Sequence, residues 1–176
     1  MNLLRIFKLF TRSIAPVLGL LCLMVDLSGA QALEKPVDKV VLTLSGQINQ
    51  LNEGKTAVFS LPMLSRLPQH TVFTKSPWYP AGADFTGPLL RDVVRAVGGQ
   101  GKTITAYALN DYTTEIPLED ALKYDVILAR LMNGHPMAVR DKGPLFVVYP
   151  FDAVAALRTQ VYYNRSAWQV NRLHIH

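Results

Sequence analysis

Residues 85–150 read FTGPLLRDVVRAVGGQGKTITAYALNDYTTEIPLEDALKYDVILARLMNGHPMAVRDKGPLFVVYP, and this stretch determines the class of fold. Gly87-Pro88 predicts a turn that places Pro88 at the start of a helix, where its missing N–H costs nothing. Apolar residues then recur at helical spacing over residues 89–97, and Gly98-Gly99 predicts the end of that helix. We therefore expect one face of this helix to pack inward.

The same stretch contains runs with the length and composition of β-strands. These runs are residues 103–108, 126–131 and 145–149. Polar loops separate them, namely residues 110–112, 132–134 and 141–144. Because the β-rich runs outnumber the convincing helices, we expect a single α+β domain with a mixed β-sheet and two or three short helices.

The flanking residues add further elements of the same kinds. Ser60 and Pro62 predict the beginning of a short helix over residues 61–67, and Pro68 predicts its end. Asn133-Gly134 has the composition of a two-residue hairpin turn. Further strands are expected over residues 40–45, 57–59, 71–75 and 168–175, with a helix-like segment over residues 154–158 and a turn at Tyr162-Tyr163-Asn164.

The N-terminal 32 residues have the organisation of a secretory signal peptide. A basic segment precedes a mostly apolar run over residues 14–25, and Ala30-Gln31-Ala32 predicts cleavage after Ala32. The alternative is a retained membrane anchor, but Asp26 interrupts a run that is already shorter than the roughly 20 residues of a spanning helix. We expect a periplasmic mature domain over residues 33–176, with no membrane attachment after cleavage.

Composition narrows the possible functions of the mature domain. The single cysteine, Cys22, leaves with the signal, so the mature domain has no disulfide. The signal carries three basic residues and one acidic residue, so its removal lowers the formal charge from +5 to +3. This mild excess, with no basic run interleaved with aromatic residues, gives no reason to expect a nucleic-acid partner.

Four segments occur in an order that resembles the sulfite-oxidase-type molybdopterin-binding domain family. They are FTGPLLRDVV, NDYTTEIPLEDA, DVILARLMNGHPM and KGPLFVVYP, and the resemblance is close over residues 85–150 and looser over residues 40–175. It implies the fold of that domain, a cleft for the molybdopterin cofactor, and oxidoreductase activity.

Two departures from the family pattern weaken the expectation of activity. The family has a cysteine thiolate that ligates molybdenum at or just after the strand expected over residues 71–75, but residues 72–78 read VFTKSPW. A hydroxyl or an ammonium group is a poor substitute for that soft ligand. The family also tends to have His-Gly-x-Pro followed by Arg, whereas this chain has Lys142-Gly143-Pro144 with Phe146 at the arginine position. Lys142 retains a positive charge without the donor fork of a guanidinium.

Candidate site residues come from the ends of the expected strands, where ligand-binding loops usually lie. We expect one cleft lined by Thr74, Lys75, Trp78, Asn110, Asp111, Tyr112, Arg130, Lys142 and Gly143. Several of these residues also have purely structural interpretations. Asp111 suits an Asx turn, Arg130 suits an ion pair with Asp111 or Asp125, and Trp78 suits a cover over the core. His174-x-His176 places two imidazoles on one strand face, but no third metal ligand is evident.

Two functions remain open at this point. The first is a non-catalytic periplasmic module that binds a small anionic or planar ligand, or an envelope protein partner, in the former cofactor cleft. The second is an active molybdopterin-dependent oxidoreductase, so whether the chain is an enzyme stays uncertain. We expect no metal and no cofactor, although molybdopterin binding through stacking and hydrogen bonds remains possible. No other catalytic motif, such as Gly-x-Ser-x-Gly or His-Glu-x-x-His, occurs.

Overall fold

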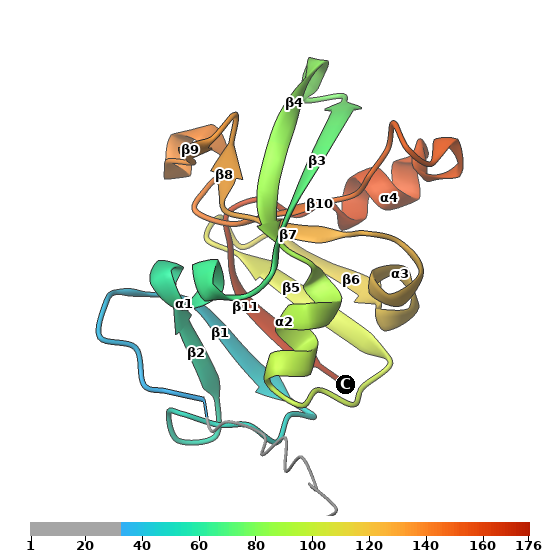
Figure 1. Ribbon diagram of the computed structural model, residues 1–176. Coiled ribbons are helices and arrows are strands. Elements are labelled where there is room, and N and C mark those ends of the chain that lie inside the picture. The colour runs from blue at the N-terminus through green and yellow to red at the C-terminus, as the bar shows by residue number, and fades with distance from the viewer. Residues whose placement is uncertain (1–32) are drawn as a thin grey trace, which may run out of the picture. The chain divides into compact units, whose positions relative to one another are not determined.

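A computed structural model describes residues 33–176 of the chain. The predicted signal peptide, its cleavage site and Cys22 lie outside the described residues. The described part is α+β with a mixed sheet and short helices, as predicted (Figure 1). None of the helices in this part has the length and apolar character needed to cross a membrane. Its elements are β1 (Val40–Gly46), β2 (Ala57–Ser60), α1 (Leu61–Arg66), β3 (Gln69–Ser76), β4 (Tyr79–Pro88), α2 (Leu90–Ala96), β5 (Thr103–Ala108), β6 (Thr113–Pro117), α3 (Leu118–Lys123), β7 (Ile127–Ala129), β8 (Leu131–Met132), β9 (His135–Pro136), η1 (Val139–Asp141), β10 (Phe146–Val148), η2 (Ala155–Leu157), α4 (Gln160–Arg165) and β11 (Val170–Ile175).

The main sheet has five strands in the order β2-β1-β11-β5-β6. The β1–β11 pair is parallel, and the other neighbours are antiparallel. Because side chains alternate along a strand, one face of the sheet is apolar, with Leu44, Leu173 and Ile104 fully buried. Helix α2 covers this face with Leu90 and Val93 (Figure 1). This aliphatic core forms the larger of two hydrophobic clusters.

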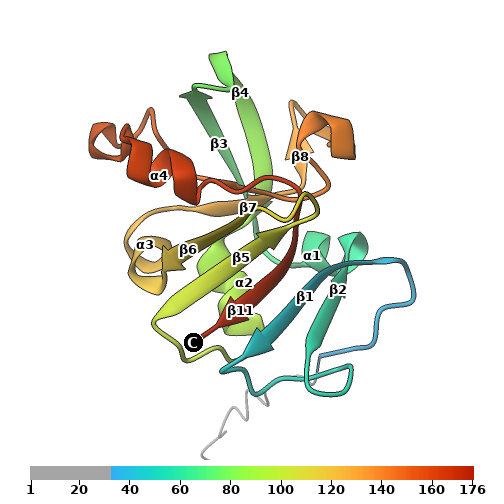
Figure 2. The same cartoon turned by 180° about the vertical axis from the view of Figure 1, so that it is seen from behind.

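None of the helices of residues 33–176 lies over the opposite face of the main sheet (Figure 2). Arg172 and His174 of β11 lie on this face, with Ser45 on the neighbouring β1 and Tyr107 on β5. Thus the main sheet is buried on one side and open on the other, as antiparallel and mixed sheets commonly are.

Smaller sheets build the second cluster. One of them has four strands in the spatial order β3-β4-β8-β9. The other consists of β7 paired with β10. The long β3–β4 hairpin extends away from the main sheet (Figure 1). Phe85, Ile127 and Phe146 are buried beneath it, and Trp78 and Trp168 pack against them as half-buried rings. Aromatic residues therefore make up a larger share of this second cluster than of the first, which also contains Phe59, Tyr149 and Phe151.

Three local predictions were wrong. Pro88 ends β4, where it pairs with Gln69, and does not begin the helix, because Leu89 is still extended and α2 begins at Leu90. The strand expected over residues 126–131 is divided into β7 and β8 at Arg130. Helix α4 appears where a turn was expected, and the Asn133-Gly134 turn joins β8 to β9 as predicted.

Candidate functional site

The aromatic residues of the second cluster converge on Trp168, which precedes β11. The Trp78 ring meets it edge to face, with centroids 5.1 Å apart. The Tyr112 ring lies parallel to it at 6.4 Å, and Phe146 approaches its edge at the same distance. We call these four residues, with Lys142, the Trp168 cluster. Segments remote in sequence thus build one surface of ring faces.

Lys142 places a positive charge on this surface. Its Nζ atom lies 4.7 Å from the centroid of the Trp168 ring and 6.0 Å from that of Tyr79, within the range of a cation–π contact. The backbone fixes this position, because Lys142 has a φ of 69° and its carbonyl accepts a hydrogen bond from the Gln169 N–H. Gly143 follows in close contact with Met137, where a β-carbon would collide with the backbone. The backbone that carries the Lys142 side chain is therefore fixed on both sides.

Tyr79 remains a neutral ring beside this ammonium group. Partial burial raises the pKa of its phenol, and the nearby Asp141 carboxylate raises it further because a second negative charge is disfavoured. Lys142 therefore faces two neutral aromatic rings. It has no carboxylate within ion-pairing distance among the described residues.

Tyr112 is fixed by its own loop. Its hydroxyl donates to the Asn164 carbonyl at 2.7 Å, and its backbone N–H donates to the Asn110 side-chain oxygen. One interpretation of the sequence assigned an Asx turn to Asp111. In the structure, Asn110 makes this turn. Asp111 has a φ of 64° and is exposed. Tyr112 is still 42% exposed, so its ring is accessible.

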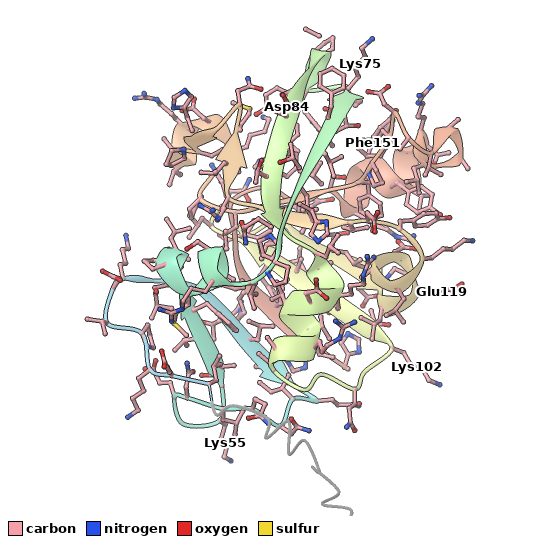
Figure 3. All side chains as sticks on the ribbon, viewed as in Figure 1. Lys55, Lys75, Asp84, Lys102, Glu119 and Phe151 are labelled. Atoms are coloured by element: carbon pink, nitrogen blue, oxygen red, sulfur yellow. The ribbon has the colours of Figure 1, made fainter. Side chains whose placement is uncertain are left out.

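The expectation that all nine candidate residues line one cleft was wrong for Lys75, which lies on the other face of its strand from Thr74. Thr74 is buried on the inner face of the β3–β4 hairpin, whereas Lys75 next to it points outward at the hairpin tip (Figure 3). The alternation of side chains along a strand explains this separation. Lys75 and Lys142 therefore do not form a joint positive field. The structure brings Trp78, Tyr112, Lys142 and Gly143 together around Trp168.

Arg130 lies at the other end of the hairpin. Its Nε atom donates to the Gln69 side chain at 2.8 Å, so its partner is neither Asp111 nor Asp125. Arg130 follows Ala129, which pairs with Phe146 of the Trp168 cluster, but its side chain is engaged by Gln69.

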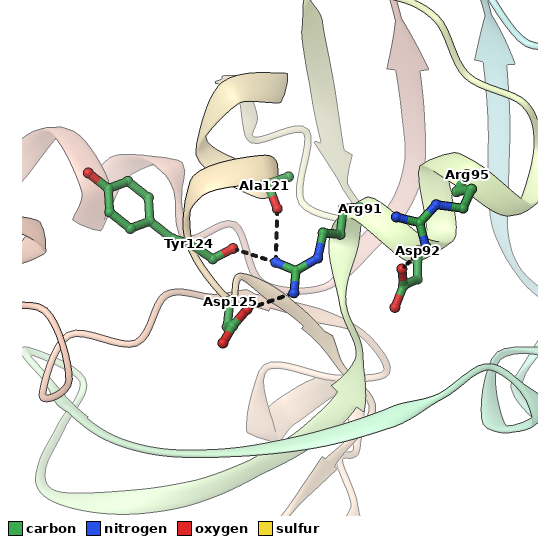
Figure 4. A network of polar contacts seen from close by, with 6 residues as sticks. All are labelled: Arg91, Asp92, Arg95, Ala121, Tyr124 and Asp125. Carbon is green, nitrogen blue, oxygen red and sulfur yellow. Dashed lines mark hydrogen bonds and ion pairs between the residues drawn. The ribbon is translucent and has the colours of Figure 1, made fainter.

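Arg91 binds Asp125 instead (Figure 4). Its guanidinium contacts the Asp125 carboxylate at 2.8 Å and also reaches the carbonyls of Ala121 and Tyr124 at the end of α3. This contact joins α2 to α3, and it explains why Asp125 is not available to Arg130.

A second polar network was missed by sequence reasoning. Asp120 of α3 accepts hydrogen bonds from the Tyr149 hydroxyl and from Arg165, both at 2.8 Å. Burial raises the pKa of Tyr149 far above its ordinary range, and the Asp120 carboxylate adds to this rise. The network lies in the aliphatic core and anchors α4, so its role is structural.

No sequence motif predicted Trp168 as the centre of the site. The sequence placed it only at the start of the last expected strand, residues 168–175. Only the amino-acid composition could have indicated this residue. The chain has two tryptophans, Trp78 and Trp168, and their rings are in contact.

Comparison with known proteins identifies the family. Residues 42–156, more than half of the chain, match the family described as the oxidoreductase molybdopterin binding domain. The chain belongs to this family. No functionally curated protein sequence matches it.

A solved structure of low sequence identity confirms the fold. The sulfane dehydrogenase SoxCD from Paracoccus pantotrophus superimposes with a TM-score of 0.57 at 22% identity. The match covers 77% of this chain and 37% of that chain, so the present chain spans well under half of the SoxCD chain.

The residues at the expected metal position do not fit a thiolate-ligated molybdenum. Residues 33–176 contain no cysteine. At the end of β3, the Thr74 hydroxyl is buried and donates to the Lys75 carbonyl at 3.3 Å, while the Lys75 side chain points away. No cluster of three or more His, Cys, Asp or Glu suited to a metal occurs within residues 33–176. Phe146 is buried as a wall of the Trp168 cluster in place of the cationic residue that the family resemblance implies.

Proposed function

We propose that this chain is a non-catalytic periplasmic member of the molybdopterin-binding domain family that binds a small planar anion at the Trp168 cluster. The observation that carries the proposal is the ammonium group of Lys142, 4.7 Å from the Trp168 ring centroid, beside the accessible ring of Tyr112. Aromatic rings contribute stacking surface, and the lysine contributes a charge for an anionic substituent. A partner protein that presents a planar acidic group would use the same contacts.

The absence of a thiol from residues 33–176 supports the non-catalytic part of the proposal. Oxo-transfer chemistry of the sulfite-oxidase type relies on a soft ligand to the metal, and neither Thr74 nor Lys75 provides one. The proposal therefore retains the fold of the family, places a ligand at the Trp168 cluster and leaves out the metal centre.

Tryptophan fluorescence offers a direct test, since both tryptophans of the chain belong to the cluster. The mature protein is titrated with pterin-6-carboxylate, a planar anion. We expect saturable quenching, and Lys142→Met should weaken binding about tenfold, which corresponds to about 1.4 kcal/mol for one lost charge contact. Lys55→Met is the matched control, because Lys55 is an exposed lysine on the β1–β2 loop. Quenching that is absent, or equal in both variants, would overturn the proposal.

An active oxidoreductase is the second candidate, and the family match over residues 42–156 favours it. Elemental analysis of protein purified from the periplasm, with mass spectrometry of the denatured supernatant, separates the two. One molybdenum per chain together with a pterin would establish the enzyme. A pterin without molybdenum would support the proposed binding module, and the absence of both is also compatible with it.

The periplasmic location is tested separately. Intact mass measurement of the protein from fractionated cells should give a chain that begins at Leu33, immediately after the proposed cleavage site. A cytoplasmic full-length chain would contradict this part of the proposal alone.

A further inference from the structure

Arg172 on the open face of the main sheet is unusual among the arginines of residues 33–176. The other arginines each make an ion pair or a side-chain hydrogen bond, as Arg91 does with Asp125 and Arg130 does with Gln69. Within the described part of the chain, the Arg172 guanidinium has neither. Its N–H donors are therefore not used by the protein itself.

Arg172 is nevertheless held in position. Its Cζ atom lies 4.2 Å from the centroid of the Tyr107 ring, on the neighbouring strand β5. Stacking on a ring uses the face of the guanidinium and leaves the in-plane N–H donors free to point outward. A guanidinium pre-positioned in this way loses less entropy when it binds an anion in a bidentate manner.

Other donors surround the same hollow. A cavity of about 260 Å³ is lined by Ser45, Tyr107, Arg172 and His174. The His174 Nδ1 atom lies 3.0 Å from the Ser45 hydroxyl, which fixes the imidazole and leaves its Nε2 atom without a partner in the described residues. No carboxylate lines this hollow. Asp111 lines an adjacent hollow that also borders Arg172, and Glu115 lies on the same face of the sheet, two strands from His174.

We propose that Ser45, Arg172 and His174 form a binding site for an oxyanion, a carboxylate or a phosphate, on the open face of the main sheet. The guanidinium supplies a two-pronged donor for two oxygens, and the imidazole and the hydroxyl supply further polar contacts. The site is separate from the Trp168 cluster, and it does not depend on the function proposed for that cluster. A free anion and an acidic side chain of a partner protein present the same chemistry to it.

The test uses the mature chain and NMR chemical shifts, with inorganic phosphate and a glutamate-rich peptide as separate probes. We expect saturable shifts centred on Ser45, Tyr107 and Arg172 with at least one probe. Preference for phosphate would identify a free anion, and preference for the peptide would identify a protein partner. Failure of both probes to give saturable shifts at these residues would overturn the proposal.

Variants make the result specific to the guanidinium. Arg172→Lys keeps the charge but loses the fork, and should weaken binding about tenfold, as expected for about 1.4 kcal/mol. Arg172→Ala should abolish it. Arg95→Lys, an exposed arginine on α2, should bind like the wild type. Thermal unfolding midpoints close to that of the wild type show that each variant is folded. Equal binding by the wild type and Arg172→Ala would overturn the assignment.

Discussion

The core of the main sheet and the Trp168 cluster bury apolar surface in different ways. In the sheet core, aliphatic side chains such as Leu44 and Leu173 are fully buried beneath α2. In the Trp168 cluster, rings meet edge to face or in parallel, and all of them except the Phe146 ring remain partly accessible. These core side chains beneath α2 are closed to solvent, whereas the cluster retains accessible ring surface and the charge of Lys142. The comparison indicates that stability resides mainly in the first region and binding in the second.

The largest expected effect is a loss of stability in the sheet core. Leu44→Ala leaves a cavity among fully buried side chains, and we expect it to lower the free energy of unfolding by about 2–5 kcal/mol. Urea denaturation gives the value. Leu122→Ala is the control, because Leu122 is 62% exposed and its truncation should cost less than about 0.5 kcal/mol. Equal losses in the two variants would contradict the division between the regions.

The buried network around Asp120 should give the next largest effect. Asp120→Asn removes the charge that holds Arg165 and accepts from the Tyr149 hydroxyl, and we expect a loss of about 2–3 kcal/mol. This value is below that of a fully buried pair because the Arg165 side chain is 23% exposed.

A surface ion pair provides the control for this variant. Asp92→Asn removes the partner of Arg95, whose side chain is 74% exposed, and should cost no more than about 1 kcal/mol. Urea denaturation of both variants at the same pH measures the difference. A cost for Asp120→Asn no larger than that for Asp92→Asn would show that the network does not anchor α4.

Periodicity and turn chemistry predicted the sheet core well. The strand over residues 103–108 coincides with β5, and the apolar spacing over residues 89–97 located α2. Helix α4 could not be predicted in this way, because its residues have weak helix preference and tertiary contacts hold it. Tyr163 packs on Phe151 at 4.9 Å, and Arg165 binds Asp120. Such contacts join segments far apart in sequence, and no local pattern encodes them.

The candidate site was predictable only in part for the same reason. Lys142 and Tyr112 were identified from their loops, but Lys75 was placed wrongly because the face that it occupies depends on the register of β3. That register sets Thr74 opposite Ala83, a buried residue, and leaves Lys75 outside. Arg130 was assigned an acidic partner on chemical grounds, whereas its position beside the start of β3 gives it Gln69.

High pH should show that burial protects the Tyr149 phenol from ionisation. The pKa of Tyr149 is raised in the folded protein, so its phenol stays protonated where the unfolded chain, with a pKa of about 10, ionises. Its contribution to stability is complete below about pH 10 and is lost as the pH rises above that value. Tyr149→Phe should remove a slope of up to about 1.4 kcal/mol per pH unit above pH 10.

The comparison for this experiment is the wild-type protein, which keeps the buried phenol of Tyr149. Urea denaturation of both proteins at several values between pH 8 and about pH 11 gives both slopes. A wild-type slope in Tyr149→Phe would show that the phenol is not protected by the fold.

The smallest expected effect is the contact between Lys142 and Trp168. A partly exposed cation–π pair contributes about 0.5–1 kcal/mol, so a double-mutant cycle with Lys142→Met and Trp168→Leu should give a coupling energy in this range. The corresponding cycle with Tyr79→Leu should give a smaller coupling, because Nζ lies 6.0 Å from that ring and 4.7 Å from Trp168. A coupling comparable to the cost of Leu44→Ala would mean that Lys142 is a structural residue of the fold. A small coupling, together with weaker binding of the planar anion by Lys142→Met, would show that the charge of Lys142 contributes more to ligand binding than to stability. The physical reason is screening: water weakens the contact between Lys142 and Trp168 in the free chain, and a bound ligand removes that water.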